Sequence, residues 1–162
     1  MSALKTLYRS DFALWSTEQA AALRAAARDG ANHQLDWENL AEEIESLGIS
    51  QRSALKSQIG RIIEHLLKLE NSPAANPRRG WIGSVLDARS EIERVLEDSP
   101  SLKNEVSAAI GAETRRVFRK VIADRRDYGE LDPNALARIG STSYTEDQIL
   151  GDWLPAECEP QR

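Results

Sequence analysis

Five side chains are the candidates for chemistry in this sequence, because each is charged or titratable and falls on or beside the apolar stripe of a predicted helix. They are Glu42, Glu45, His65, Arg89 and Glu113. Carboxylates and imidazoles transfer protons and bind divalent cations, while a guanidinium binds anions. If the five line one interior, they indicate an enzyme or a metal-binding protein. The alternative for each is structural: a solvated face, a hydrogen-bonded boundary histidine or a buried ion pair.

Charge is distributed unevenly along the chain. The segment from Asp36 to Gly48 carries five acidic residues and no basic one, whereas residues 113–127 carry six basic and three acidic residues. The acidic segment is interpreted as a solvated helix face, a carboxylate cluster for a divalent cation, or a source of ion pairs with arginines. Attraction between the two segments, within one chain or between subunits, is the simplest role for the basic one. Nucleic-acid contact through residues 115–126 is the alternative.

Arg89 and Glu113 each fall inside the apolar stripe of their own helix. These helices, predicted over residues 81–98 and 100–127, are joined by Ser99-Pro100, a turn so short that the helices must be antiparallel neighbours. Counting outward from this turn puts the two side chains at similar depth, since a helix rises about 1.5 Å per residue. We therefore predict a buried ion pair between Arg89 and Glu113.

Several classes of site are excluded by what the sequence lacks. There is no Gly-x-x-x-x-Gly-Lys loop, no Gly-x-Gly-x-x-Gly loop and no Gly-x-Ser-x-Gly elbow. One cysteine, Cys158, and two histidines, His33 and His65, are too few for a disulfide or a transition-metal site. The sequence thus predicts no cofactor and no bound metal.

The overall charge and hydropathy restrict the partners. A net charge of −5 disfavours nucleic acid as a ligand. No apolar run approaches the roughly 18 to 20 residues that span a bilayer, and Arg9 and Asp11 interrupt the N-terminal region where a signal peptide would need an apolar core. We expect a cytoplasmic protein with no membrane association.

Composition and caps predict an all-α fold. Alanine and leucine outnumber isoleucine and valine by 39 to 16, a balance that favours helices over strands. The main helices are expected over residues 17–29, 37–47, 50–70, 81–98 and 100–127. The first should begin at a capping box of Ser16 and Gln19, and the second at Asp36. Gly48 either ends that second helix or lies inside one longer helix.

We expect these helices to form a single helical bundle, one domain over residues 1–162, with a loosely structured C-terminal tail from about residue 129. More than half of the chain should be helical. Trp37 should be substantially buried. The predicted apolar stripe of its helix contains Trp37, Leu40, Ala41, Ile44 and Leu47.

The acidic segment, Asp-Trp-Glu-Asn-Leu-Ala-Glu-Glu-Ile-Glu-Ser-Leu-Gly at residues 36–48, resembles the main motif of a bacterial family known as domain of unknown function 29. Further similarity extends over residues 8–125. It is carried by Tyr8, Asp11, Phe12, Trp15, Gln19, residues 65–68, Trp81, Arg89 and residues 100–102. The resemblance implies an all-helical bundle and implies no activity.

The function that these observations favour is that of a small interaction or regulatory module in the cytoplasm. It would act through helix faces, as a homo-oligomer or on a protein partner. The alternative is the enzyme or metal-binding protein built on the five polar candidates, and nucleic-acid binding comes third. The sequence does not decide whether the protein is an enzyme.

Overall fold

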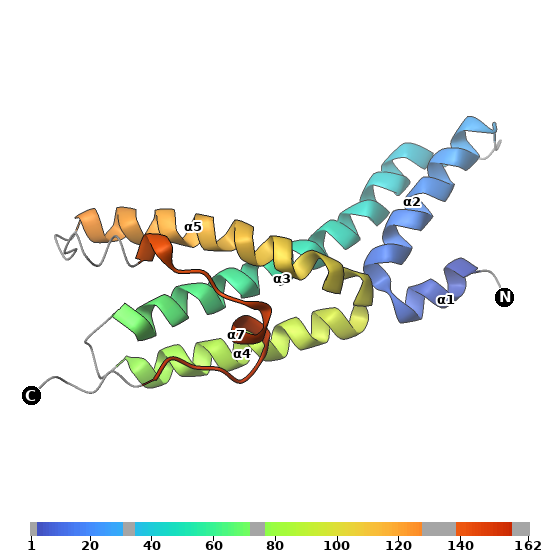
Figure 1. Cartoon of the computed structure of the whole chain (residues 1–162). Coiled ribbons are helices and arrows are strands. Elements are labelled where there is room, and N and C mark those ends of the chain that lie inside the picture. The colour runs from blue at the N-terminus through green and yellow to red at the C-terminus, as the bar shows by residue number, and fades with distance from the viewer. Residues whose placement is uncertain (1–2, 31–34, 72–76, 128–138, 157–162) are drawn as a thin grey trace, which may run out of the picture. The chain divides into compact units, whose positions relative to one another are not determined.

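The computed structural model describes residues 3–30, 35–71, 77–127 and 139–156. These residues form helices and contain no strand, which confirms the all-α class (Figure 1). More than half of the 162 residues lie in helices, as predicted. The elements are α1 (Ala3–Ser10), α2 (Phe12–Arg28), α3 (Trp37–Asn71), α4 (Arg78–Asp98), the 3₁₀ helix η1 (Pro100–Glu105), α5 (Val106–Asp127) and α7 (Glu146–Leu150). None of these helices is long and apolar enough to cross a membrane.

The start of α2 differs from the prediction. Asp11, not Ser16, is the N-cap, because its carboxylate accepts a hydrogen bond from the backbone N–H of Leu14 at 3.0 Å. The hydroxyl of Ser16 instead donates to the carbonyl of Ala13 at 2.9 Å, inside the helix. At the other end, Gly30 has a φ of 72°, a conformation that favours glycine, so the predicted stop is confirmed.

Helix α3 runs without interruption through Gly48, so the longer-helix alternative is correct. Asp36 caps its start as predicted, with the N–H of Asn39 donating to Asp36 Oδ1 at 3.2 Å. Gly48 is buried against α2, where an added Cβ would collide with Ser16 Oγ and lie 3.3 Å from the carbonyl oxygen of Ala13. Glycine is needed here for close helix approach and not for a turn.

The chain divides into two compact units. The first consists of Met1–Leu55 with Glu93–Asn104, and the second of Lys56–Ile92 with Glu105–Arg162. Both α3 and α4 contribute to each unit. That residues 1–162 form one domain stays a prediction.

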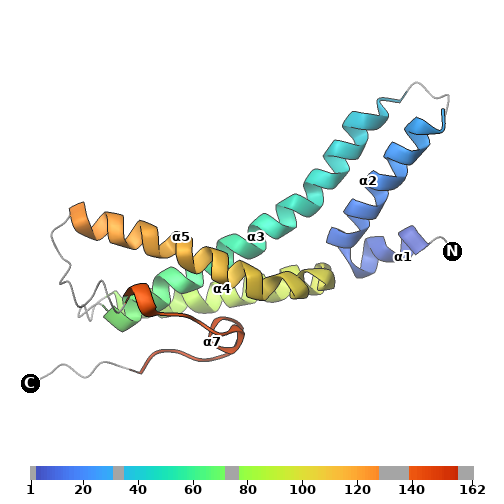
Figure 2. The same ribbon diagram turned by 45° about the horizontal axis from the view of Figure 1, so that its top comes forward.

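In the first unit, α2 and the N-terminal part of α3 form an antiparallel hairpin (Figures 1 and 2). The interface between them is lined by small side chains, because Ala13, Ala20 and Ala41 are fully buried. A polar lock ties α2 to the segment after α4. Asp11 accepts hydrogen bonds from the N–H of Ser101 at 2.6 Å and from its hydroxyl at 2.9 Å, and Ser99 Oγ accepts one from the N–H of Ala13 at 3.1 Å.

The second unit has a core of branched and aliphatic side chains. The α3 stripe of Ile59, Ile62, Ile63 and Leu66 is fully buried, as the periodicity indicates. Helix α5 lies along this part of α3, and α4 contributes Val85 and Ile92. The part of the predicted loose tail that the structure describes is ordered by contacts: Tyr144 and Ile149 are buried, and Tyr144 donates a hydrogen bond to Glu70 at 2.8 Å.

Trp37 is mostly buried, as expected, and its Nε1 atom is fully buried. Two expectations about burial are wrong. Leu40 and Leu47, assigned to the core stripe, are 40% and 43% exposed. The buried line of α3 in this unit passes through Ala41, Gly48 and Leu55, which are seven residues apart, and the leucines lie to one side of it.

Candidate functional site

Arg89 does not pair with Glu113, so that prediction is wrong. Its guanidinium donates to three backbone carbonyls, those of Gln148 at 2.8 Å, Ile149 at 2.9 Å and Trp153 at 2.7 Å. Burial lowers the pKa of the Arg89 side chain, and the charge of Asp152 opposes this effect. Arg89 therefore holds α7 and the residues after it in place.

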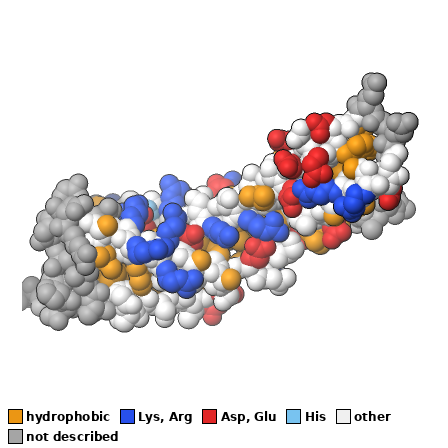
Figure 3. Space-filling view, turned by 90° about the horizontal axis from the view of Figure 1, so that it is seen from above, with side chains coloured by type: hydrophobic (Ala, Val, Ile, Leu, Met, Phe, Trp, Pro, Cys, Tyr) orange, Lys and Arg blue, Asp and Glu red, His pale blue; other side chains and the backbone are white. Residues whose placement is uncertain are grey.

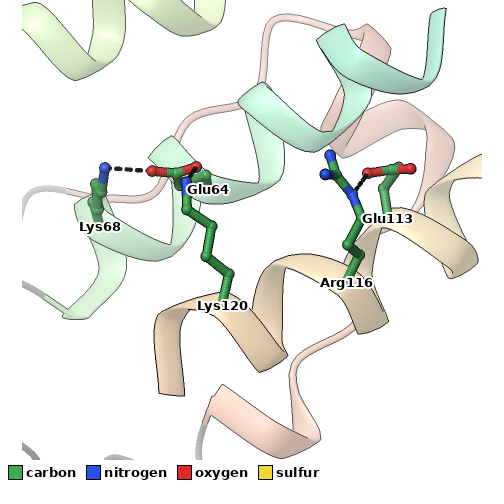
Figure 4. Close-up of polar contacts among 5 residues, drawn as sticks. All are labelled: Glu64, Lys68, Glu113, Arg116 and Lys120. Carbon is green, nitrogen blue, oxygen red and sulfur yellow. Dashed lines mark hydrogen bonds and ion pairs between the residues drawn. The ribbon is translucent and has the colours of Figure 1, made fainter. Parts of the chain in front are cut away.

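The stripe position of Glu113 was predicted correctly, because this residue is only 8% exposed. Its carboxylate pairs with Arg116 Nε at 2.6 Å, one turn along α5 (Figure 4). The depth count failed because the chain begins as the 3₁₀ helix η1 after the turn, and α5 starts only at Val106. A 3₁₀ helix has about 3.0 residues per turn, whereas an α-helix has about 3.6. Residues 100–105 therefore change the direction in which the side chains of α5 point around the helix axis.

A second ion-pair group joins α3 to α5. Glu64 accepts hydrogen bonds from Lys68 at 2.7 Å and from Lys120 at 3.0 Å (Figure 4). Burial alone would raise the pKa of this carboxyl, but the two lysines lower it to about 2. Glu64 is thus charged throughout the physiological range.

His65 lies beside the buried stripe of α3, as predicted, and is partly exposed. Burial is the main cause that lowers its pKa, and the charges of Lys68, Arg61 and Lys120 lower it further against the opposing charge of Glu64. Its Nδ1 atom is buried without a hydrogen-bond partner among the described residues. His65 is therefore neutral at pH 7, with one polar ring atom unsatisfied.

The acidic segment of α3 is partly neutralised inside the first unit. Arg24 of α2 binds Glu45 at 2.8 Å and Glu38 at 3.3 Å, and these hydrogen bonds raise the pKa of Arg24. The interpretation as ion pairs with arginines is confirmed for these two carboxylates. Glu42 is exposed. In the described part of the chain, no group of three or more His, Cys, Asp or Glu side chains is placed to hold a metal ion.

The five candidates are divided between the two units. Glu42 and Glu45 belong to the first, and His65, Arg89 and Glu113 to the second. Among the described residues, no hydrogen bond or ion pair joins any two of them. A catalytic role for any of the five stays a hypothesis. Cys158 and His33 lie outside the described residues.

A pocket opens between α3 and α5 in the second unit, with a volume of about 300 Å³. Charged side chains dominate its lining. The lining residues are Ser57, Gly60, Arg61, Glu64, His65, Arg116, Val117 and Lys120. Of the sequence candidates, only His65 lines it. Arg116 and Lys120 were noted in the sequence only as part of the basic stretch at residues 113–127, and Arg61 was not singled out.

An exposed apolar group was missed because its members were assigned to the core. Seven large apolar side chains of the described residues are exposed, and all but Leu86 lie in the first unit. Two of them, Leu40 and Leu47, share one face of α3 with the half-buried Ile44. Figure 3 shows acidic side chains gathered over the first unit and basic side chains over the second. The side chains of Arg125 and Arg126 lie outside the described set.

Comparison with known proteins agrees with this fold. A crystal structure of an alpha-helical protein of unknown function from Rhodospirillum rubrum matches with a TM-score of 0.68 and 23% sequence identity, over 88% of each chain. No curated protein matches. The family described as Domain of unknown function DUF29 matches residues 7–154. With nearly its whole length inside that match, the chain belongs to the DUF29 family.

Proposed function

We propose that this chain is an interaction module of the bacterial cytoplasm that associates with a second copy of itself. The apolar face of α3 in the first unit, formed by Leu40, Ile44 and Leu47, docks against the outer face of α5 in the partner copy. The observation that carries the proposal is the exposure of large apolar side chains within the most acidic segment of the chain.

The apolar face has the spacing that a helix partner requires. Leu40, Ile44 and Leu47 are four and three residues apart, so they follow one side of α3. They lie roughly opposite Glu38 and Glu45, which Arg24 of α2 covers. Burying a fully exposed leucine side chain is worth about 1.5 to 3 kcal/mol. Leu40 and Leu47 are 40% and 43% exposed, so covering both would contribute about 1 to 2.5 kcal/mol in each contact.

Charge complementarity favours α5 as the partner surface. Asp36, just before α3, and Glu43 are exposed beside the apolar face, while Arg115 and Arg119 are exposed on α5. On α5 these arginines share a face with the exposed Ala108 and Ala112, whose small side chains allow a second helix to approach closely. Opposite charges would steer the encounter, and the apolar side chains would hold the complex.

A second copy is the occupant that the charges support best, because both complementary surfaces belong to the same chain. In a twofold-symmetric dimer each contact between the faces occurs twice, which doubles its contribution. A different protein with a basic amphipathic helix is the competing occupant. The two are separated by the oligomeric state of the purified protein.

The test is sedimentation equilibrium or light scattering over about 1 to 100 μM protein. The wild type is expected to dimerise, and the double variant Leu40→Gln/Leu47→Gln to be monomeric. The matched control is Leu86→Gln, because Leu86 is an equally exposed leucine (48%) outside the proposed face. A wild type that is monomeric at 100 μM would refute self-association.

A charge exchange tests the choice of α5. Glu43→Lys and Arg115→Glu/Arg119→Glu should each weaken the dimer by about tenfold or more, since like charges then oppose one another. Mixing the two variants should restore the dimer, because the heterodimer has one native contact and one contact with the two charges exchanged, and both join opposite charges. If the mixture associates no better than either variant alone, α5 is not the partner surface.

A further inference from the structure

We propose that the pocket between α3 and α5 in the second unit binds a small phosphate-bearing anion. This site is independent of the self-association proposed above. It uses the inner basic side chains of α5, Arg116 and Lys120, together with Arg61 and His65 of α3. No transferred group or catalytic step is implied.

The charge of the lining selects an anion. Three cationic side chains and one carboxylate line the pocket, an excess of two positive charges. The carboxylate, Glu64, already binds Lys68 as well as Lys120, so the pocket contains no unneutralised negative charge. A doubly charged phosphate would balance the remaining cations, and Lys120 and Arg61 present multiple N–H donors.

Arg116 is held in place for this role. Its Nε donates to the buried Glu113, and within the described part of the chain this is the hydrogen bond that the guanidinium makes. A Cβ on Gly60 would lie 2.9 Å from Glu113 Oε2 and 3.1 Å from Arg116 Nη2, so the pair packs directly on the α3 backbone at a position without a side chain. One edge of the guanidinium is thereby fixed, and its terminal nitrogens can meet the paired oxygens of a phosphate.

His65 supplies a second, independent observation. Its Nδ1 is buried and lacks a hydrogen-bond partner among the described residues, an arrangement that normally costs free energy. If the ring turns so that Nδ1 faces the pocket, the neutral tautomer with a proton on Nδ1 can donate to an anion oxygen and the atom gains a partner. Burial is the main cause that lowers the pKa of this imidazole, and the cations of Lys68, Arg61 and Lys120 lower it further, so a bound anion would offset the repulsion from these cations.

Size limits the class of ligand. At about 300 Å³ the pocket is at the lower end of the range for small-molecule sites. It accommodates inorganic phosphate or a phosphomonoester of a small molecule. An extended nucleic acid would instead contact the open basic surface of α5, which includes Arg115 and Arg119.

The first experiment measures phosphate binding by calorimetry and by the thermal midpoint of the chain, at constant ionic strength with chloride as the reference salt. Inorganic phosphate and glycerol 3-phosphate are the two probes. We expect saturable binding, weakened at least tenfold in Arg61→Gln and in Lys120→Gln. Both variants should fold, because Arg61 is exposed and Glu64 keeps Lys68 as a partner. Tighter binding of glycerol 3-phosphate would identify a phosphomonoester as the ligand, and equal binding would identify free phosphate.

Matched controls remove the same charge nearby. Lys56→Gln and Arg79→Gln alter exposed cations of the second unit that do not line the pocket. They should bind both probes as the wild type does. If phosphate stabilises all variants equally, or no more than chloride, the pocket is not an anion site.

A second experiment observes His65 directly by imidazole NMR, with the other histidine removed by His33→Gln. Sulfate replaces phosphate here because its charge is constant between pH 5 and 8. Sulfate bound in the pocket should raise the pKa of His65 and shift its Nδ1 resonance, and Lys120→Gln should reduce both effects. An unchanged His65 pKa at saturating sulfate would overturn the assignment. So would binding of a single-stranded oligonucleotide that depends equally on Arg119 and Lys120, because an open helix surface would then be the site.

Discussion

Replacing Asp11 by alanine is expected to be the most destabilising polar substitution in the first unit. The Asp11 side chain joins the start of α2 to the segment that follows α4, across 90 residues of sequence. It is only 8% exposed and accepts three hydrogen bonds, from the N–H of Leu14 and from the N–H and hydroxyl of Ser101. Alanine removes all three and leaves backbone donors without partners.

The magnitude follows from these contacts. Losing an N-cap costs about 1 kcal/mol, and each further hydrogen bond to a charged acceptor in a partly buried place contributes about 1 kcal/mol or more. Asp11→Ala should therefore lower the free energy of unfolding by about 3 kcal/mol. Asp11→Asn keeps one acceptor oxygen but turns an amide donor toward the N–H of Ser101, so it should lose about 2 kcal/mol. Ser101→Ala removes a single bond and should lose about 1 kcal/mol.

The assay is urea unfolding followed by far-ultraviolet circular dichroism. Ser10→Ala and Asp29→Asn are the controls, since both side chains are exposed at helix ends of the same unit and should change stability by no more than about 0.5 kcal/mol. The order of the three test variants is the informative result. Equal losses of unfolding free energy for Ser101→Ala and Asp11→Ala, or a loss under about 0.5 kcal/mol for Asp11→Ala, would contradict the role of these hydrogen bonds.

Three further outcomes are expected. Gly48→Ala should destabilise the chain in urea by about 1 to 3 kcal/mol although alanine favours helices, because the methyl group meets Ser16, and Ser16→Gly should relieve part of this loss. Protonation of Glu64, whose pKa is about 2 in the folded chain against an ordinary 4.5, should remove about 2 kcal/mol as the pH falls from 4.5 to 2, and Glu64→Gln should abolish this part of the acid sensitivity. Arg89→Met should increase amide hydrogen exchange in residues 145–153 at least tenfold while the core of α3 stays protected, and unchanged exchange there would contradict the role of Arg89.

The sequence predicted the helix ends well where a single nearby residue determines them. Asp36 begins α3 and Gly30 follows α2, because a capping carboxylate and a glycine at positive φ act within a few residues of themselves. Ser16 failed because a better cap, Asp11, lies five residues earlier and starts the helix first. Gly48 could not be assigned from the sequence, since its role depends on Ser16 of another helix.

The candidate sites were less predictable, because they depend on phase and on contacts between distant segments. Glu113 was correctly placed in the buried stripe, yet its partner is Arg116 of the same helix. The six residues of η1 rotate α5 relative to a continuous α-helix, and nothing in the turn at Ser99 indicates that rotation. Leu40 and Leu47 were assigned to the core because periodicity identifies an apolar face without showing what covers it.

The two proposals depend on different basic side chains of α5. Arg24 binds carboxylates of the first unit, and Lys68, Arg116 and Lys120 bind carboxylates of the second. The basic side chains of α5 form two rows about 100° apart around the helix axis, because consecutive residues of a helix differ by that angle. Arg116 and Lys120 face the pocket, while Arg115 and Arg119 form the outer row. Self-association should respond to the outer row and phosphate to the inner one, so each proposal can fail without the other.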